Sequence, residues 1–309
     1  MATVRADTSD ILKFAAHHIE AGADRLIIYL DEDTSGARGA LEEHPACTVI
    51  LCDESYWMTE HGRRPLRHQV RQSQNANHAY VRAHDLDWIA HIDVDEFIAC
   101  DTGIRETLSA LAPAVKTARL RPMEALARED GKTPEAFKAF VPGGAARRET
   151  AARLYPTFGA YIKGGFVSHV AGKLFVRTGL NNIKLRIHNV LQNQAKVEDE
   201  VAPDGLGLAH LHTTSWTHWR SHLDYRHAKG SYRSELRGPL PPEQGGMNLH
   251  DLFSFLIRDQ GEAGLRAFYD EVCADTPELR SRLQAAGLLR RLDLDLNATA
   301  ARHFPGVAV

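Results

Sequence analysis

The sequence has few cysteines, no long hydrophobic run and no long run of basic residues, and each shortage excludes a class of protein. Four cysteines without a C-x-x-C pair favour reduced, buried thiols over a disulfide framework or a zinc site. The longest apolar stretches, 26–30 and 88–92, are too short to span a bilayer, so no transmembrane segment is expected. A net charge of −3, with basic residues in runs no longer than pairs, argues against a nucleic-acid binder.

Familiar nucleotide-binding and targeting motifs are missing as well. The sequence contains neither a P-loop (G-x-x-x-x-G-K-[ST]) nor the G-x-G-x-x-G pattern of dinucleotide-binding proteins. The N-terminus has no apolar signal-peptide core, which favours a cytoplasmic protein. The remaining composition is that of an ordinary globular protein, with 309 residues of which 43% are hydrophobic and 25% charged. It suffices for one large domain or two modest ones.

The first hundred residues alternate between strand-like and helix-like patterns. The run 26–30 has no polar alternation, so it is expected to be a strand buried on both faces. Further strands are expected at 48–51 and 88–92, and helices at 8–22, up to 41, and at 65–83. This alternation predicts a parallel α/β sheet wound in the Rossmann manner.

The pattern loosens beyond residue 100. Strands are expected at 118–121 and 174–177, a loop or lid at 142–152, and helices at 252–257 and 277–289. A segment rich in proline and glycine, 239–246, separates these last helices from the centre of the chain.

Three carboxylates, those of Asp93, Asp95 and Glu96, directly follow the apolar run 88–92. Like charges held close together repel unless something neutralises them, and a divalent cation is the simplest neutraliser. Alternate carboxylates on an extended segment point the same way, so Asp93 and Asp95 can both reach one hard cation. The carboxyl end of a strand in an open α/β sheet is also where ligands are expected. The alternative is a strand end whose acids cap a helix or pair with arginines.

The D-x-D tripeptide alone is weak support, because it occurs at three further places, Asp31/Asp33, Asp85/Asp87 and Asp293/Asp295. The last two pairs are most simply solvated loop acids. Asp31 and Asp33 close the strand 26–30, so they are expected at the same sheet edge as Asp93 and could hold a nucleotide base or ribose. The alternative is an N-cap for the helix that follows Gly36.

The helix expected at 65–83 has a polar face with Arg67, Arg71, Asn75 and His78 at helical spacing. This face could supply guanidinium and amide donors to a diphosphate or a sugar. A solvated helix face is the alternative.

Three segments, HHIEAGADRLIIYLDEDTSG, RQSQNANHAY and DWIAHIDVDEF, together resemble the family 2-type glycosyltransferases of the GT-A fold, in particular a bacterial branch whose metal motif is D-V-D-E-F. The resemblance is good over residues 5–100 and weaker over 165–235. It implies an α/β fold of the GT-A type, Rossmann-like, with a mostly parallel central sheet flanked by helices. It also implies a GT-A domain at 1–235, with a nucleotide-sugar half to about residue 100 and an acceptor half after it, and a helical C-terminal extension at 236–309.

The resemblance further implies a metal-dependent, inverting transfer from a nucleoside-diphosphate sugar, most simply a UDP-sugar, to a hydroxyl acceptor such as a carbohydrate. Such a reaction would serve surface polysaccharide or glycoconjugate synthesis, with Mn²⁺ or Mg²⁺ as cofactor. The residues implied as metal ligands are Asp93, Asp95 and His188. Those expected to contact the donor are Asp31, Asp33, Arg71, Asn75 and Lys173, and the expected catalytic carboxylates are Glu96 and Asp95.

For His188 alone, a strand histidine bonded to the backbone is the alternative. Two other functions also fit the pattern. One is a non-catalytic nucleotide- or carbohydrate-binding module with a degenerate site, because fold does not imply function. The other is a metal-dependent nucleotidyl- or phosphotransferase, which also has carboxylates at a sheet edge.

Overall fold

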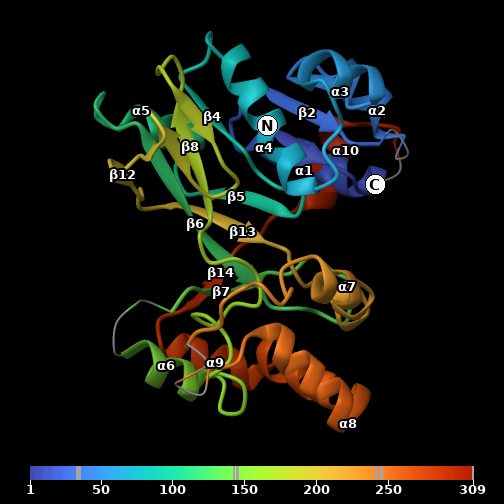
Figure 1. The fold of residues 1–309 in the computed structure, drawn as a ribbon, viewed down its shortest axis with the longest axis vertical. Coiled ribbons are helices and arrows are strands. Elements are labelled where there is room, and N and C mark those ends of the chain that lie inside the picture. The colour runs from blue at the N-terminus through green and yellow to red at the C-terminus, as the bar shows by residue number, and fades with distance from the viewer. Residues whose placement is uncertain (33–35, 142, 144–145, 241–242, 244–245, 308–309) are drawn as a thin grey trace. The chain divides into compact units, whose positions relative to one another are not determined.

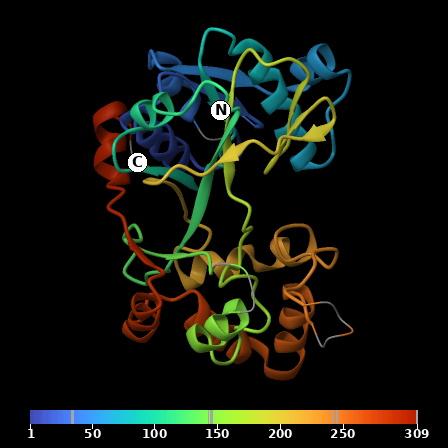
Figure 2. The same cartoon turned by 90° about the vertical axis from the view of Figure 1, so that its left-hand side faces the viewer.

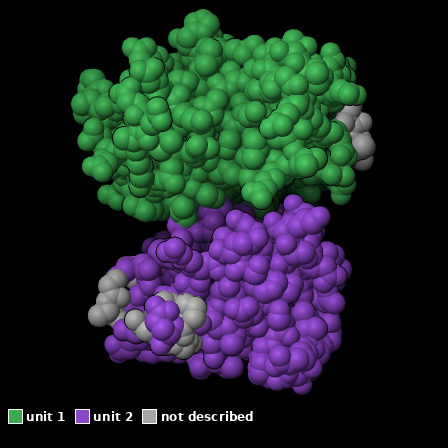
Figure 3. Space-filling model, viewed as in Figure 1, with its two compact units in different colours: residues 1–121, 171–208, 295–309 green, residues 122–170, 209–294 purple. Residues whose placement is uncertain are grey.

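The structure is a computed structural model and describes residues 1–32, 36–141, 143, 146–240, 243 and 246–307. Helices and strands are mixed along the chain (Figure 1), as the expected α/β class requires. The chain forms two compact units (Figure 3). The first comprises residues 1–121, 171–208 and 295–309, and the second comprises residues 122–170 and 209–294. The predicted boundary near residue 235 is not tested by this division and stays a prediction.

A parallel three-stranded sheet lies in the first unit, in the order β1 (Ala2–Val4), β2 (Leu26–Leu30) and β3 (Cys47–Leu51). Every residue of β2 is buried, which confirms the expectation from its unbroken apolar sequence. The helices of this unit include α1 (Thr8–Glu20), α2 (Ala37–Glu43), α3 (Glu54–His61), α4 (His68–Arg82), α5 (Ile104–Ser109) and α10 (Leu296–His303). The helices and strands expected over the first hundred residues are therefore largely confirmed.

Helix α1 illustrates how the sequence sets these elements. It begins after Asp7, whose backbone is extended, and buries Ile11, Leu12 and Phe14 on one face. The chain leaves the helix at Gly22, which has φ +99°, a conformation that glycine adopts without a Cβ penalty. On the outer side of α1 lies the C-terminal helix α10, seen in red beside the blue N-terminal segment (Figure 2).

The other strands of the first unit do not continue the parallel pattern. Strand β4 (Trp88–Ala90) pairs antiparallel with β8 (Lys173–Arg177), and β8 pairs antiparallel with β6 (Thr117–Ala125). Strand β12 (Glu200–Val201) is parallel to β6, and β13 (Leu206–His210) lies between β6 and β5 (Glu96–Cys100). The expected mostly parallel central sheet is thus seen only in part. The sequence pattern predicts strands, but it does not predict whether a strand from much later in the chain will pair parallel or antiparallel, as β8 does with β4.

A small antiparallel sheet completes the first unit, with β9 (Ile183–Leu185), β10 (Val190–Gln192) and β11 (Ala195–Lys196). Strands β10 and β11 are joined by Asn193 and Gln194, both with positive φ, as a two-residue hairpin turn requires.

The second unit combines a small antiparallel sheet with helices. The end of β6 pairs with β7 (Ala136–Ala139), which pairs with β14 (Leu289–Arg291). The helices include α6 (Ala146–Leu154), α7 (Trp216–Ala228), α8 (Leu249–Val272) and α9 (Pro277–Ala285). Pro277 is at the start of α9 as expected, whereas most of the loop expected at 142–152 is helix α6.

The core of the second unit contains a buried ion pair among aromatic side chains. Trp219, Phe253 and Phe268 are wholly buried and pack edge to face or stacked. Lys138 Nζ lies 3.0 Å from Glu124 Oε1, and both side chains are about 1% exposed. None of the described helices in either unit is long and apolar enough to cross a membrane.

Candidate functional site

The carboxylates that follow the apolar run lie in a tight turn between two strands. Strand β4 ends at Ala90, earlier than expected, and Glu96 is the first residue of β5. The backbone N–H of Glu96 donates to the carbonyl oxygen of Asp93 at 3.0 Å, and the N–H of Asp93 donates to Glu96 Oε2 at 2.9 Å. We call residues 93–96 the carboxylate turn. Glu96 closes this turn and is wholly buried, whereas Asp95 is half-buried.

A buried lysine meets two of the three carboxylates. Lys173 Nζ lies 2.6 Å from Asp93 Oδ2 and 3.4 Å from Glu96 Oε2, and its side chain is 0% exposed. Burial alone would lower the pKa of Lys173, but the charges of Asp93 and Glu96 outweigh it and raise that pKa. Part of the neutralising charge that the sequence assigns to a cation therefore comes from the protein.

The other oxygen of Asp93 is also held. Gln72, which is buried on α4, donates from Nε2 to Asp93 Oδ1 at 2.6 Å. The buried ring of His91 has Nε2 3.8 Å from the same oxygen. Burial, with Lys173 nearby, lowers the pKa of His91 to about 3, so this ring is neutral. These contacts hold both oxygens of the Asp93 carboxylate and so fix its orientation.

At the end of β2, Asp31 and Arg71 are brought together with two more basic side chains. Arg71 donates to Asp31 Oδ2 from Nε at 3.0 Å and from Nη2 at 2.7 Å. Arg64 Nη2 lies 3.1 Å from Asp31 Oδ1. Burial would raise the pKa of Asp31, but hydrogen bonds from His68 and Arg71 and the nearby guanidinium charges hold it well below its usual value. Two guanidinium groups against one carboxylate leave this group positive.

Asn75, expected to contact the donor, lies in the protein core with no exposed surface. Its Nδ2 donates to Thr3 Oγ1 at 3.1 Å, and its Oδ1 accepts from the hydroxyl of Tyr56 at 2.8 Å. The amide thereby joins β1, α3 and α4. A contact between Asn75 and a donor stays a prediction, and Asp33 lies outside the described residues.

His188 lies in the turn between β9 and β10. Its Nδ1 is 3.0 Å from the carbonyl oxygen of Gly172, the residue before Lys173. A carbonyl only accepts hydrogen bonds, so Nδ1 carries a proton, and in the neutral form of the ring the lone pair is on Nε2. His188 is thus bonded to the backbone, the alternative considered above. The same kind of bond from one ring nitrogen also commonly orients a histidine that binds a metal through the other, so the predicted metal role stays a prediction.

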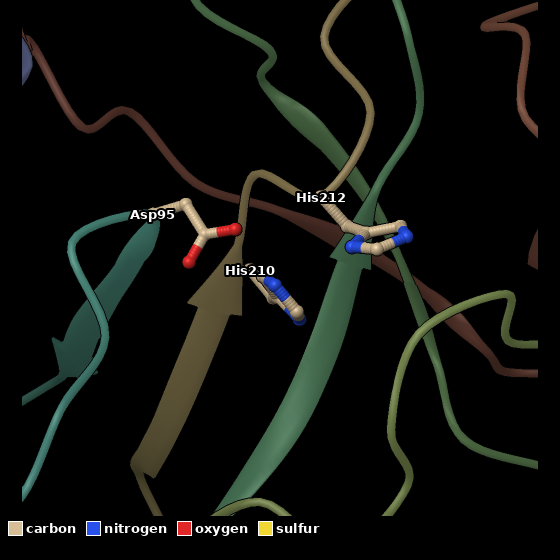
Figure 4. A group of neighbouring side chains, drawn as sticks. All are labelled: Asp95, His210 and His212. Atoms are coloured by element: carbon tan, nitrogen blue, oxygen red, sulfur yellow. The ribbon is translucent and has the colours of Figure 1, made fainter. Parts of the chain in front are cut away.

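Two histidines of the second unit were not singled out from the sequence. His210 ends β13 and His212 follows at the alternate position, with ring centroids 5.2 Å apart. Burial and the nearby charge of Arg226 hold the pKa of His212 well below its usual value, and its Nε2 is 2.9 Å from the hydroxyl of Tyr232. Figure 4 draws the side chains of His210 and His212. An H-x-H pattern at the end of a strand is the signal that could have pointed to them.

The sequence model of glycosyltransferase family 92 matches residues 1–238. A search of curated proteins gave no match. The expected sugar transfer is confirmed at this level, and the enzyme class with it. The GT-A fold, the family 2-type branch and the roles of the individual site residues stay predictions. Since the match covers most of the 309 residues, the chain belongs to glycosyltransferase family 92.

Proposed function

We propose that the protein transfers a sugar from a UDP-sugar to a hydroxyl acceptor, with inversion, and that Mn²⁺ or Mg²⁺ binds at Asp93 and Asp95. Membership of family 92 supports sugar transfer in general. The observation that carries the finer proposal is the carboxylate turn, in which three carboxylates stand within four residues and two of them meet the buried ammonium group of Lys173. That turn and the positive group around Asp31 are joined by α4, which contributes Gln72 to one and Arg71 to the other.

The residues of the turn fit a divalent cation in their chemistry. Hard cations prefer carboxylate oxygens, and Asp93 is oriented by Gln72 and Lys173 in the manner of a supported ligand. Asp95, half-buried, would be the second ligand, and His188 a third through Nε2. When bound, such a cation would neutralise the charge of the leaving diphosphate.

The positive group around Asp31 suits the nucleotide part of the donor. Arg64 has a side chain that is 43% exposed, so its guanidinium can also meet an anionic ligand while it touches Asp31. Asp31 itself keeps Arg71 in a fixed orientation through two hydrogen bonds to one oxygen.

The two carboxylates expected to be catalytic differ in what they can do. Glu96 is wholly buried, accepts a bond from the backbone of Asp93 and faces Lys173, so we assign it to holding the turn. Asp95 is the more open of the two and is the one we expect to meet the cation or the acceptor hydroxyl.

Calorimetric titration with UDP in the presence of Mn²⁺ tests the proposal. Asp95→Asn should weaken binding by about 10–100-fold, the range seen when a group that supports a metal site is removed. Asp93→Asn should do the same, but it also removes the counter-ion of Lys173, so its folding needs checking by thermal melting. The matched control is Asp85→Asn/Asp87→Asn, which neutralises a D-x-D pair in an exposed turn of the same unit. Equal binding by Asp95→Asn and the parent would refute the metal assignment.

A further inference from the structure

A groove of about 1020 Å³ runs between helix α4 and the β9–β10 hairpin of the first unit. Gln69, Ser73 and Gln74 line it from the helix, and Lys184, Arg186 and His188 line it from the hairpin. It lies on a different face of α4 from Arg71 and Gln72, which contact Asp31 and Asp93. Apart from His188, the groove lining is therefore distinct from the residues assigned above to the donor and the cation.

The two walls are fixed to each other by one side chain. Asn77 on α4 donates from Nδ2 to the carbonyl oxygen of Leu185 at 3.0 Å, and the N–H of Leu185 donates to Asn77 Oδ1 at 2.9 Å. This pair of bonds continues the hydrogen bonding of β9 onto the helix. The groove is consequently a built feature and not a chance gap between side chains.

The charges in the groove favour an anionic ligand. Its one acidic lining residue, Glu60, lies 3.2 Å from the guanidinium group of Arg82, which offsets its charge. Lys184 and Arg186 are exposed, and no ion pair joins either of them to another described residue. Two cations thus remain without an acidic partner along one wall.

The remaining lining suits a sugar chain. Gln74 Oε1 is buried and accepts no hydrogen bond from the described residues, so a ligand hydroxyl could satisfy it. Gln69 and Ser73 add side-chain donors and acceptors, while Val70 and Ile187 offer apolar surface to the C–H faces of a sugar ring. Amides, a hydroxyl and two cations together match a saccharide that carries carboxylates.

The groove also lies near the proposed reaction site. His188, one of its lining residues, is bonded to Gly172, next to the Lys173 that holds Asp93. Gln72, which bonds to Asp93, sits on α4 between the lining residues Gln69 and Ser73. From these contacts we propose that the groove binds an acidic oligosaccharide as the acceptor chain, an inference that rests on the proposed function.

Binding of a hexameric oligogalacturonate, with its methyl-esterified neutral form as the matched probe, tests the inference. The parent should bind the acidic probe more tightly than the ester, and binding should weaken as salt is raised, because exposed charges are screened. Lys184→Glu/Arg186→Glu should weaken binding of the acidic probe by about tenfold or more, equivalent to about 1.4 kcal/mol. Arg290→Glu/Arg291→Glu, on an exposed strand of the second unit, makes the same charge change and should leave binding as in the parent.

UDP binding with Mn²⁺ is measured on the parent in parallel, so that failure of this inference can be told apart from failure of the proposed function. If the parent binds UDP but not the acidic probe, or binds probe and ester equally, the groove assignment is wrong and the donor site stands. Equal binding by Lys184→Glu/Arg186→Glu and the parent overturns the groove in the same way. If the probe binds in the groove and UDP does not bind, the proposed function fails, and the groove is retained as an acidic-saccharide site without the acceptor role.

Discussion

The ammonium nitrogen of Lys173 lies 2.6 Å from Oδ2 of Asp93, a residue 80 positions earlier in the chain. Lys173 has no exposed surface, so its charge cannot be balanced by water and depends on Asp93 and Glu96. The same contact orients Asp93. Two acids that would otherwise repel each other are thereby held on one buried ammonium group.

Lys173→Met should destabilise the protein by about 3 kcal/mol, the lower end of the range for breaking a buried ion pair. The lower end is expected because Asp93 keeps some exposure, 26% of its side chain. Urea denaturation measures the free energy of unfolding. Lys196→Met, which alters an exposed lysine on β11, is the control and should change it little. Equal stability of the parent and Lys173→Met would show that the buried contact is not needed for folding.

Asp31→Asn should impair both stability and UDP binding, because it removes the partner of Arg71, whose side chain is only 12% exposed. Denaturation and calorimetry on the same variant give the two effects. The neighbouring exposed pair of Glu32 and Arg5 provides the control, since Glu32→Gln should cost no more than about 1 kcal/mol. If Asp31→Asn behaves like Glu32→Gln in both measurements, the group around Asp31 has no special role.

Asn75→Ala separates a structural role from a donor contact. The variant removes the hydrogen bonds of Asn75 to buried Thr3 and to the hydroxyl of Tyr56, which should cost about 1–3 kcal/mol. If Asn75 has only a structural role, the variant should have a lower melting temperature. Its dissociation constant for UDP, measured where the variant is folded, should be unchanged. Asn181→Ala, at an exposed position, should change neither quantity. Weaker UDP binding without a loss of stability would instead support the donor contact expected from the sequence.

The buried pair of Glu124 and Lys138 makes stability depend on pH. Burial would raise the pKa of Glu124, but the charge of Lys138 and hydrogen bonds from Val167 and Ser168 lower it below the ordinary 4.5. A carboxyl with a lowered folded pKa stabilises the protein fully above its unfolded pKa, and this stabilisation is lost as the pH falls toward the folded value. Glu124→Gln should therefore lower the free energy of unfolding by about 3–5 kcal/mol at neutral pH, and this difference from the parent should shrink below pH 4.5.

Unfolding of the parent and Glu124→Gln between pH 3 and pH 7 (roughly the range over which carboxyl groups titrate) measures this effect. Glu135→Gln, whose side chain is 61% exposed and pairs with Arg128, is the control and should show a small deficit at every pH. A deficit for Glu124→Gln that stays constant with pH would mean that the carboxylate charge is not what stabilises the pair.

Features that depend on local pattern were predicted well. The unbroken apolar run of β2 indicated a strand buried on both faces, and the apolar spacing of α1 indicated its limits within about two residues. The position of the carboxylates next to a strand end was also predicted, although the strand stops at Ala90 and Glu96 starts the next one.

Features that depend on contacts between distant segments were not predicted. Nothing local to Lys173 indicates that it is buried against Asp93, and helical spacing alone does not show that Arg71 bonds to Asp31, 40 positions earlier. Asn75 lies one turn from Arg71 and was expected on the same polar face, yet it is in the core because Thr3, Cys52 and Tyr56 supply polar partners there. A polar side chain can be buried when hydrogen-bond partners surround it in the fold, and the sequence alone does not show which distant residues will be those partners.

Release of UDP from UDP-sugars is the most direct test that this protein is a metal-dependent glycosyltransferase. A panel of UDP-sugars is incubated with the protein after chelation by EDTA, and again after Mn²⁺ is restored in excess. We expect UDP release from at least one donor with Mn²⁺, no release after chelation, and little release by Asp95→Asn under either condition. Release that is unaffected by chelation, or saturable UDP binding without release from any donor, would contradict metal-dependent transfer at the carboxylate turn.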